Sequence, residues 1–132
     1  TNALIRAYRP LLDELDLTYP QYLVMLALWD EDKVIIKDLV QRTRFDAGTL
    51  TPILKRLETK GLVSTAKATG DSRQKLVLLT ATGKQLAEQA KQTPDNISCQ
   101  IKMTPQDAQQ LKALAEQLYS LIQHNLVSER IE

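Results

Sequence analysis

The segment LVSTAKATGDSRQKLVLLTATG contains two short runs of strand-forming residues separated by a polar tip. The runs are Leu62–Lys67 and Lys75–Leu79, and their spacing predicts a β-hairpin. A hairpin tip needs only turn-forming residues. This tip also holds Asp71 and Arg73, and each arm carries a lysine beside it. Because the turn does not need these charges, they indicate a binding role for the hairpin.

Two predicted helices precede the hairpin. Lys37–Thr43 is predicted to be a short helix, and after a break Asp46 is a good N-cap for a longer helix that runs to Lys60 and ends at Gly61. Pro52 lies inside the longer helix and removes one backbone hydrogen bond, so we expect its first turns to be tightened or to start after Asp46. The order short helix, turn, longer helix and hairpin predicts a mainly α fold with a small β-hairpin, the winged helix-turn-helix.

The flanking segments are predicted to be mostly helical. Thr18 can cap a helix that has Pro20 in its first turn, and Gln21 completes a capping box. This helix continues to Trp29, is apolar on nearly every side, and should be central and buried. The other expected elements are a helix over 2–15 bent at Pro10, a very short strand at 34–35, a helix over 81–92 capped by Thr80, and a last amphipathic helix from Thr104 to about Arg130.

The charge of the chain is unevenly distributed. The segment from Lys33 to Lys75 has ten basic and four acidic residues, whereas the remainder has seven basic and twelve acidic residues. The net charge of +1 therefore combines a segment of +6 with flanks of −5. This favours a surface that binds a polyanion, although chance clustering on a solvated surface gives the same pattern.

Double-stranded DNA is the polyanion that the winged helix-turn-helix pattern indicates, because the major groove admits one α-helix. The second helix is the expected reading element. Gly48, Thr49 and Thr51 are small enough to approach base edges, and the threonine methyls can contact thymine. Lys55 and Arg56 follow on the same helix and are expected to contact bases or phosphates.

The hairpin beside this helix is expected to lie over the flanking minor groove. Arg73 can insert there, where the potential is most negative in narrow A·T-rich stretches. Asp71 can hold the guanidinium in one orientation, and Lys67 and Lys75 are expected near phosphates. The simpler alternative is a surface Asp–Arg pair at a turn, which contributes little energy.

The length of 132 residues suits a single winged-helix domain over 1–132. We expect residues 18–80 to form its DNA-binding core and residues 1–17 and 81–132 to form dimerisation helices. Neither terminal helix can bury its apolar face within so small a domain, and a two-fold homodimer is the commonest solution.

Several functional classes are disfavoured by what the sequence lacks. The single cysteine, Cys99, excludes an internal disulfide framework and fits a reducing compartment such as the cytoplasm. Together with a single histidine, His124, it cannot form a Cys/His zinc site. The glycines are isolated, so no phosphate loop indicates an enzyme or a cofactor. No run of about 18 apolar residues predicts a membrane span. We expect His124 on a helix surface, and Trp29 and Phe45 in the core. A winged helix that binds only protein remains an alternative.

Two stretches carry a resemblance to a known family. FDAGTLTPILKRLETKGLV followed by DSRQKLVLLTATG resembles the recognition helix and Asp-x-Arg wing of the MarR family of winged-helix repressors. AYRPLLDELDLTYPQYLVMLALW is similar to the organic hydroperoxide sensors of that family, the OhrR group. The resemblance covers almost the whole chain. It implies a homodimer, joined by both terminal helices, that binds an inverted-repeat operator and represses a peroxidase gene.

The resemblance also implies a redox switch that responds to organic hydroperoxide. In the OhrR group two tyrosines of one subunit hydrogen-bond the reactive thiolate in the first helix of the other, and they match Tyr8 and Tyr19. The sensor cysteine should precede Tyr8 by about four turns of ~3.6 residues, upstream of Thr1, unless this member lacks it. Cys99 looks like the resolving cysteine that forms an intersubunit disulfide.

The residues themselves leave alternatives open. Tyr8 and Tyr19 can equally be ordinary interface tyrosines, and Cys99 can be a small buried residue. Within the MarR family, the alternative mechanism is a repressor relieved by a small phenolic ligand bound between the domains.

Overall fold

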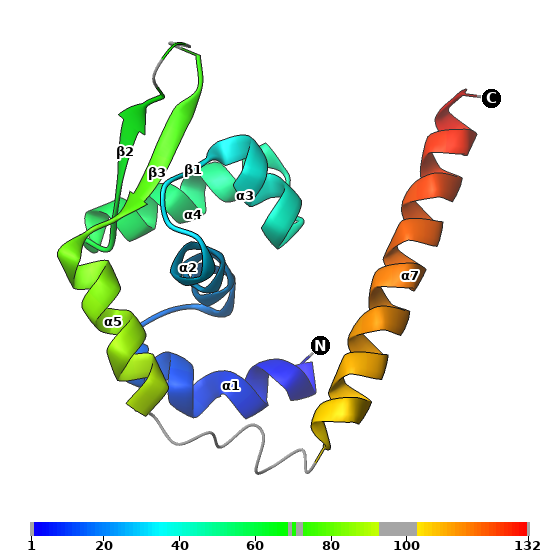
Figure 1. Ribbon diagram of the computed structural model, residues 1–132, viewed down its shortest axis with the longest axis horizontal. Helices are drawn as coiled ribbons and strands as arrows, with labels where there is room; N and C mark the ends of the chain where they lie inside the picture. Colours follow the sequence, from blue (N-terminus) through cyan, green and yellow to red (C-terminus); the bar gives the residue numbers. More distant parts are fainter. Residues whose placement is uncertain (1, 69, 71–72, 93–102, 132) are drawn as a thin grey trace. The chain divides into compact units, whose positions relative to one another are not determined.

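The computed structural model describes residues 2–68, 70, 73–92 and 103–131 (Figure 1). The chain forms two compact units, Thr1–Asp95 and Asn96–Glu132. The elements of the first unit are α1 (Asn2–Leu15), α2 (Tyr19–Asp30), β1 (Val34–Ile35), α3 (Ile36–Thr43), α4 (Ala47–Thr59), β2 (Val63–Lys67), β3 (Lys75–Leu79) and α5 (Ala81–Gln92), and the second unit contains α7 (Pro105–Ile131). The predicted mainly α winged-helix fold is confirmed, whereas the assignment of all 132 residues to one domain stays a prediction.

The three strands form one antiparallel sheet in the order β1-β3-β2. Val63 pairs with Leu79 and Lys67 pairs with Lys75, so β2 and β3 form the predicted hairpin. The expected short strand at 34–35 is present, and it adds to the hairpin by pairing Val34 with Val77. Figure 1 shows that β2 and β3 extend beyond the helices of the first unit.

The core of the first unit surrounds α2. Val24, Met25 and Leu28 of this helix are completely buried, as predicted. Leucines of α3 and α4 pack on them, together with Val77 of β3. The prediction that α2 is buried on nearly every side is wrong on one side, because Leu26 is 41 % exposed. An apolar pattern around a helix predicts burial but does not say which neighbours supply it.

Two helix starts are fixed by side chains, as predicted. The backbone N–H of Gln21 donates to Thr18 Oγ1 over 3.3 Å, and the N–H of Thr18 donates to Gln21 Oε1 over 3.1 Å, which completes the capping box. Asp46 caps α4, and its Oδ1 accepts from the N–H of Thr49 over 2.7 Å. The expected tightening or late start of α4 is wrong, since the helix is α-helical from Ala47. Pro52 removes one N–H but has a φ that suits a helix, so the cap decides the start.

The start of α5 packs closely on the turn that follows α4. A Cβ on Gly83 would lie 2.1 Å from the carbonyl oxygen of Leu62, so this contact requires glycine. Trp29 Nε1 donates to the Gly83 carbonyl over 2.9 Å, and the N–H of Thr80 donates to the Leu62 carbonyl over 3.1 Å. These contacts hold the base of the hairpin against both α2 and α5.

Candidate nucleic-acid interface

Helix α4 has one buried face and one exposed face. Leu50, Leu54 and Leu57 point into the core. All five positions of α4 that were predicted to contact DNA are exposed, namely Gly48, Thr49, Thr51, Lys55 and Arg56. The structure therefore brings these five residues together on one accessible surface.

Pro52 belongs to the same exposed surface and is missing from the predicted set. It lies one helical turn after Gly48 and one turn before Lys55 and Arg56. The helical period of α4 was the signal that could have identified it, because residues three or four apart share a face.

The N-terminal end of α4 carries a negatively charged cap. The backbone N–H of Thr49 bonds to the Asp46 carboxylate and, with the Thr49 hydroxyl, lowers its pKa below the usual value. Asp46 therefore stays ionised at neutral pH. Its charge is favourable at the positive end of the helix dipole, and it fixes the backbone next to Gly48 and Thr49.

A hollow of about 260 Å³ separates α4 from the hairpin. Its lining residues are Ile36, Thr51, Leu54, Lys55, Glu58, Thr65 and Lys75. Thr65 of β2 donates its hydroxyl hydrogen to Glu58 of α4 over 2.8 Å, which links the two walls. Two of the predicted DNA-binding lysines, on α4 and on β3, thus face the same space.

The hairpin carries the other predicted cations on its arms and near its tip. Lys67 and Lys75 are directly opposite each other in the antiparallel register, and both are exposed. Arg73 is also exposed. Asp71, the predicted orienting partner of Arg73, lies outside the described residues. Like charges directly opposite on a sheet repel each other, so the arms form a local site of positive potential.

The tyrosines that the resemblance indicated lie side by side. The ring centroids of Tyr8 on α1 and Tyr19 on α2 are 5.6 Å apart in an edge-to-face arrangement. Tyr22 lies 6.0 Å from Tyr8 and 6.2 Å from Trp29, so four aromatic rings form a chain. Cys99 lies outside the described residues. Trp29 and Phe45 pack against the core as predicted, and His124 is exposed on α7.

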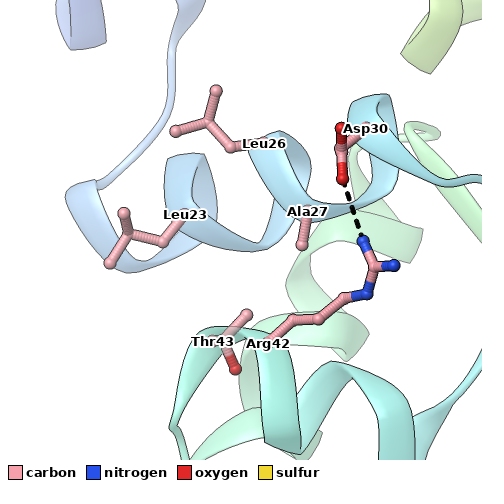
Figure 2. Close-up of a pocket in the computed structure, with 6 residues that line it drawn as sticks. All are labelled: Leu23, Leu26, Ala27, Asp30, Arg42 and Thr43. Atoms are coloured by element: carbon pink, nitrogen blue, oxygen red, sulfur yellow. Dashed lines mark hydrogen bonds and ion pairs between the residues drawn. The ribbon is translucent and has the colours of Figure 1, made fainter. Parts of the chain in front are cut away.

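A second hollow, of about 380 Å³, lies between α2 and α3. Figure 2 shows Leu23, Leu26 and Ala27 on one wall and Thr43 with Arg42 on the other. Arg42 donates to Asp30 over 3.1 Å and also pairs with Glu31. The hollow thus has an apolar wall and a charged end, which suits a small amphipathic molecule.

No metal-binding cluster is found among the residues that the structure describes. Across the same residues, no helix is long and apolar enough to span a membrane.

The family model described as "Transcriptional regulator SarA/Rot" matches residues 6–90. The chain belongs to this family of MarR-type winged-helix regulators. The resemblance stated from the sequence is therefore confirmed. The family model and a relative from Bacillus subtilis are both named as transcriptional regulators.

Two bacterial proteins are similar to this chain. The chain is 38 % identical over 123 residues to the organic hydroperoxide resistance transcriptional regulator of Bacillus subtilis, and the match covers 93 % of this chain and 82 % of the relative. It is also similar to AbfR of Staphylococcus epidermidis. Reduced AbfR bound to DNA matches with 32 % identity and a TM-score of 0.74 over 93 % of this chain and 83 % of AbfR. The disulfide form matches with 31 % identity and a TM-score of 0.68 over 89 % and 82 %.

Proposed function

We propose that this chain is a dimeric, cytoplasmic repressor that binds an inverted-repeat DNA operator and releases it when organic hydroperoxide oxidises a cysteine. The observation that carries the proposal is the exposed face of α4 beside the basic arms of the hairpin. Membership of the SarA/Rot family and the similarity to DNA-bound AbfR support DNA as the polyanion.

The exposed face of α4 would enter the major groove. Gly48, Thr49 and Thr51 would approach the bases, and Lys55 and Arg56 would bind bases or phosphates. Two features of α4 favour this role. The Asp46 cap fixes its first turn, and its buried leucines anchor the helix to α2. A rigid reading helix loses little conformational entropy on binding.

The hairpin would act as the wing in the minor groove. Arg73 would enter that groove with Asp71 as its orienting partner. Lys67 and Lys75 repel each other across the strands, and a phosphate between them would remove this repulsion. Replacing Lys75 by Gln should therefore reduce the salt dependence of binding by about one counterion. Lys91 on α5, which pairs with Glu88 at 3.6 Å, supplies a matched control in Lys91→Gln.

Dimerisation would bring two reading helices to successive major grooves. Within the described chain, α7 exposes an apolar stripe in which each side chain is at least 49 % exposed. The stripe consists of Leu111, Leu114, Leu118, Leu121 and Ile122. Burial of this stripe against a second subunit would remove it from water. Light scattering should show a dimer at micromolar concentration, and a stable monomer would contradict the operator mechanism.

The redox step would begin at a sensor thiolate of the first helix that lies upstream of Thr1. The thiolate attacks the hydroperoxide, its sulfur becomes a sulfenic acid, and the alcohol leaves. The Cys99 thiol of the other subunit then attacks this sulfur, which forms a disulfide and releases water. The rings of Tyr8 and Tyr19 lie side by side, and hydrogen bonds from both hydroxyls to one thiolate would lower its pKa. AbfR has been solved in a disulfide form, which supports this chemistry in the family.

One observation favours a second mechanism within the same family. The hollow between α2 and α3 joins the apolar Leu23 and Leu26 to the Arg42–Asp30 ion pair. A small phenolic ligand has an apolar ring and a polar end that match this lining. A repressor relieved by such a ligand would release DNA without any change in cysteine oxidation.

Electrophoretic mobility shifts at two salt concentrations would test DNA binding. Binding through several phosphates must weaken steeply with salt, whereas a winged helix that binds only protein would shift no duplex at either concentration. A protein extended upstream should then release DNA on addition of organic hydroperoxide and rebind after reduction by dithiothreitol. Release by a phenol alone would favour the ligand mechanism instead.

A further inference from the structure

The exposed face of α4 has a proline at its centre. Proline is the least favourable residue inside a helix, and burial does not explain this one, because Pro52 is exposed. The position before it on the same face is Gly48. Among the residues that the structure describes, a Cβ at Gly48 would meet nothing closer than Asp46 Oδ1 at 3.4 Å, so their packing does not require glycine there. Side chains of a helix lean toward its N-terminus, so the Pro52 ring lies over the space that Gly48 leaves open.

The threonines of α4 have already used their hydroxyl hydrogens. Thr51 donates to the Ala47 carbonyl over 2.8 Å, and Thr59 donates to the Lys55 carbonyl over 3.0 Å. The hydroxyl of Thr49 bonds to the Asp46 carboxylate. A hydroxyl has one hydrogen, so these side chains have no donor left for a base. Their oxygens can still accept a hydrogen bond, and their methyl groups remain for apolar contact.

The composition of α4 also excludes the usual reading of adenine. Asparagine and glutamine read adenine through two hydrogen bonds, and neither occurs in Ala47–Thr59, all of which the structure describes. Glu58 accepts the bond from Thr65. For an A·T pair in the major groove, the feature that an apolar surface can recognise is the C5-methyl group of thymine.

We propose that Pro52 and the methyl group of Thr51 read the C5-methyl of thymine, with Gly48 providing the room for this contact. The inference rests on the proposed binding of α4 in the major groove. It assigns base specificity to apolar contacts on α4, while Lys55 and Arg56 hold phosphates or guanine.

The probe is a duplex selected for binding from a random-sequence library. Each thymine is replaced in turn by deoxyuridine, which lacks only the methyl group. At least one position in each half-site should bind about fourfold more weakly, which corresponds to ~0.8 kcal/mol for one buried carbon group. Pro52→Ala should reduce the difference in affinity between the thymine and deoxyuridine duplexes at that position.

Two further variants separate the methyl from the hydroxyl. Thr51→Val keeps the methyl and should retain affinity, whereas Thr51→Ser keeps the hydroxyl and should lose about fourfold. Pro52→Ala restores an N–H that can bond to the Gly48 carbonyl, so it should make the protein more resistant to thermal unfolding while weakening DNA binding. Loss of folding cannot produce that combination.

The inference would be overturned if deoxyuridine left the affinity unchanged at every position. It would also be overturned if Thr51→Val lost affinity and Thr51→Ser did not. In that case salt-dependent binding of the selected duplex would leave the proposed function standing. If the wild-type protein selects no duplex at all, the proposed function fails and this inference fails with it.

Discussion

Replacing Gly83 by alanine adds one methyl group and should destabilise the fold. The new Cβ would lie 2.1 Å from the Leu62 carbonyl oxygen and 3.2 Å from Leu79 Cδ2. Since the first contact is with backbone, no side-chain rotation can relieve it, and α5 must move away from the turn after α4. Overpacking of this kind costs about 1–3 kcal/mol. The move would also stretch the bond from Trp29 Nε1 to Gly83, worth about 1 kcal/mol.

The higher helix propensity of alanine opposes these losses by about 1 kcal/mol. The expected net decrease in the free energy of unfolding is therefore about 1–3 kcal/mol. Urea unfolding followed by the fluorescence of Trp29, which lies at the affected contact, measures it directly. Gly48→Ala is the matched control, because that site is exposed and its nearest contact is ordinary at 3.4 Å. The control should gain up to about 1 kcal/mol. Equal stabilisation by both substitutions would refute the reasoning about Gly83.

Four other outcomes are expected. Arg73→Ala should weaken operator binding by about 1–3 kcal/mol at matched salt, and unchanged affinity in a folded dimer would contradict wing insertion. Thr49→Asp should abolish DNA binding by placing a carboxylate in the major groove. Because Asp is favourable in the first turn of a helix, circular dichroism should show that the variant is folded. Wild-type affinity for DNA would mean that the assumed rotation of α4 in the groove is wrong. Asp46 has a lowered pKa in the folded state, so its ionised carboxylate stabilises the fold fully above the unfolded-state pKa of about 3.9. This stabilisation is lost as pH falls through the folded-state pKa, and Asp46→Asn should flatten this part of an acid-unfolding curve. In a protein extended upstream, Cys99→Ser should prevent the peroxide-induced intersubunit disulfide on non-reducing gels, and its persistence would exclude Cys99 as the resolving residue.

The elements that sequence predicted best are those set by local chemistry. The bounds of β3 and α5 agree with the structure residue by residue, and the capping box at Thr18 is formed as expected. Asp46 and Gly61 mark the ends of α4 because a cap and a left-handed glycine act within one turn. These signals need no knowledge of distant residues.

The features that sequence could not give depend on partners far along the chain. The pairing of β1 with β3 joins Val34 to Val77, and the close contact of Gly83 with Leu62 depends on how two helices meet. Leu26 has the same apolar character as its buried neighbours, yet it is 41 % exposed among the residues that the structure describes.

The tyrosine pair combines both kinds of information. Tyr8 and Tyr19 are matched by resemblance, but only the turn between α1 and α2 brings their rings to 5.6 Å. That turn is fixed by Asp16, whose φ of 54° is left-handed, and the Lys60 ammonium at the end of α4 donates to the Asp16 carbonyl. The pair is therefore formed within one subunit, and the turn that supports it is bonded to Lys60 at the end of α4. If a sensor thiolate binds beside the two tyrosines, its oxidation would occur next to the turn between α1 and α2. Since Lys60 of α4 is bonded to this turn, a movement of the turn would be passed directly to the helix proposed to bind DNA.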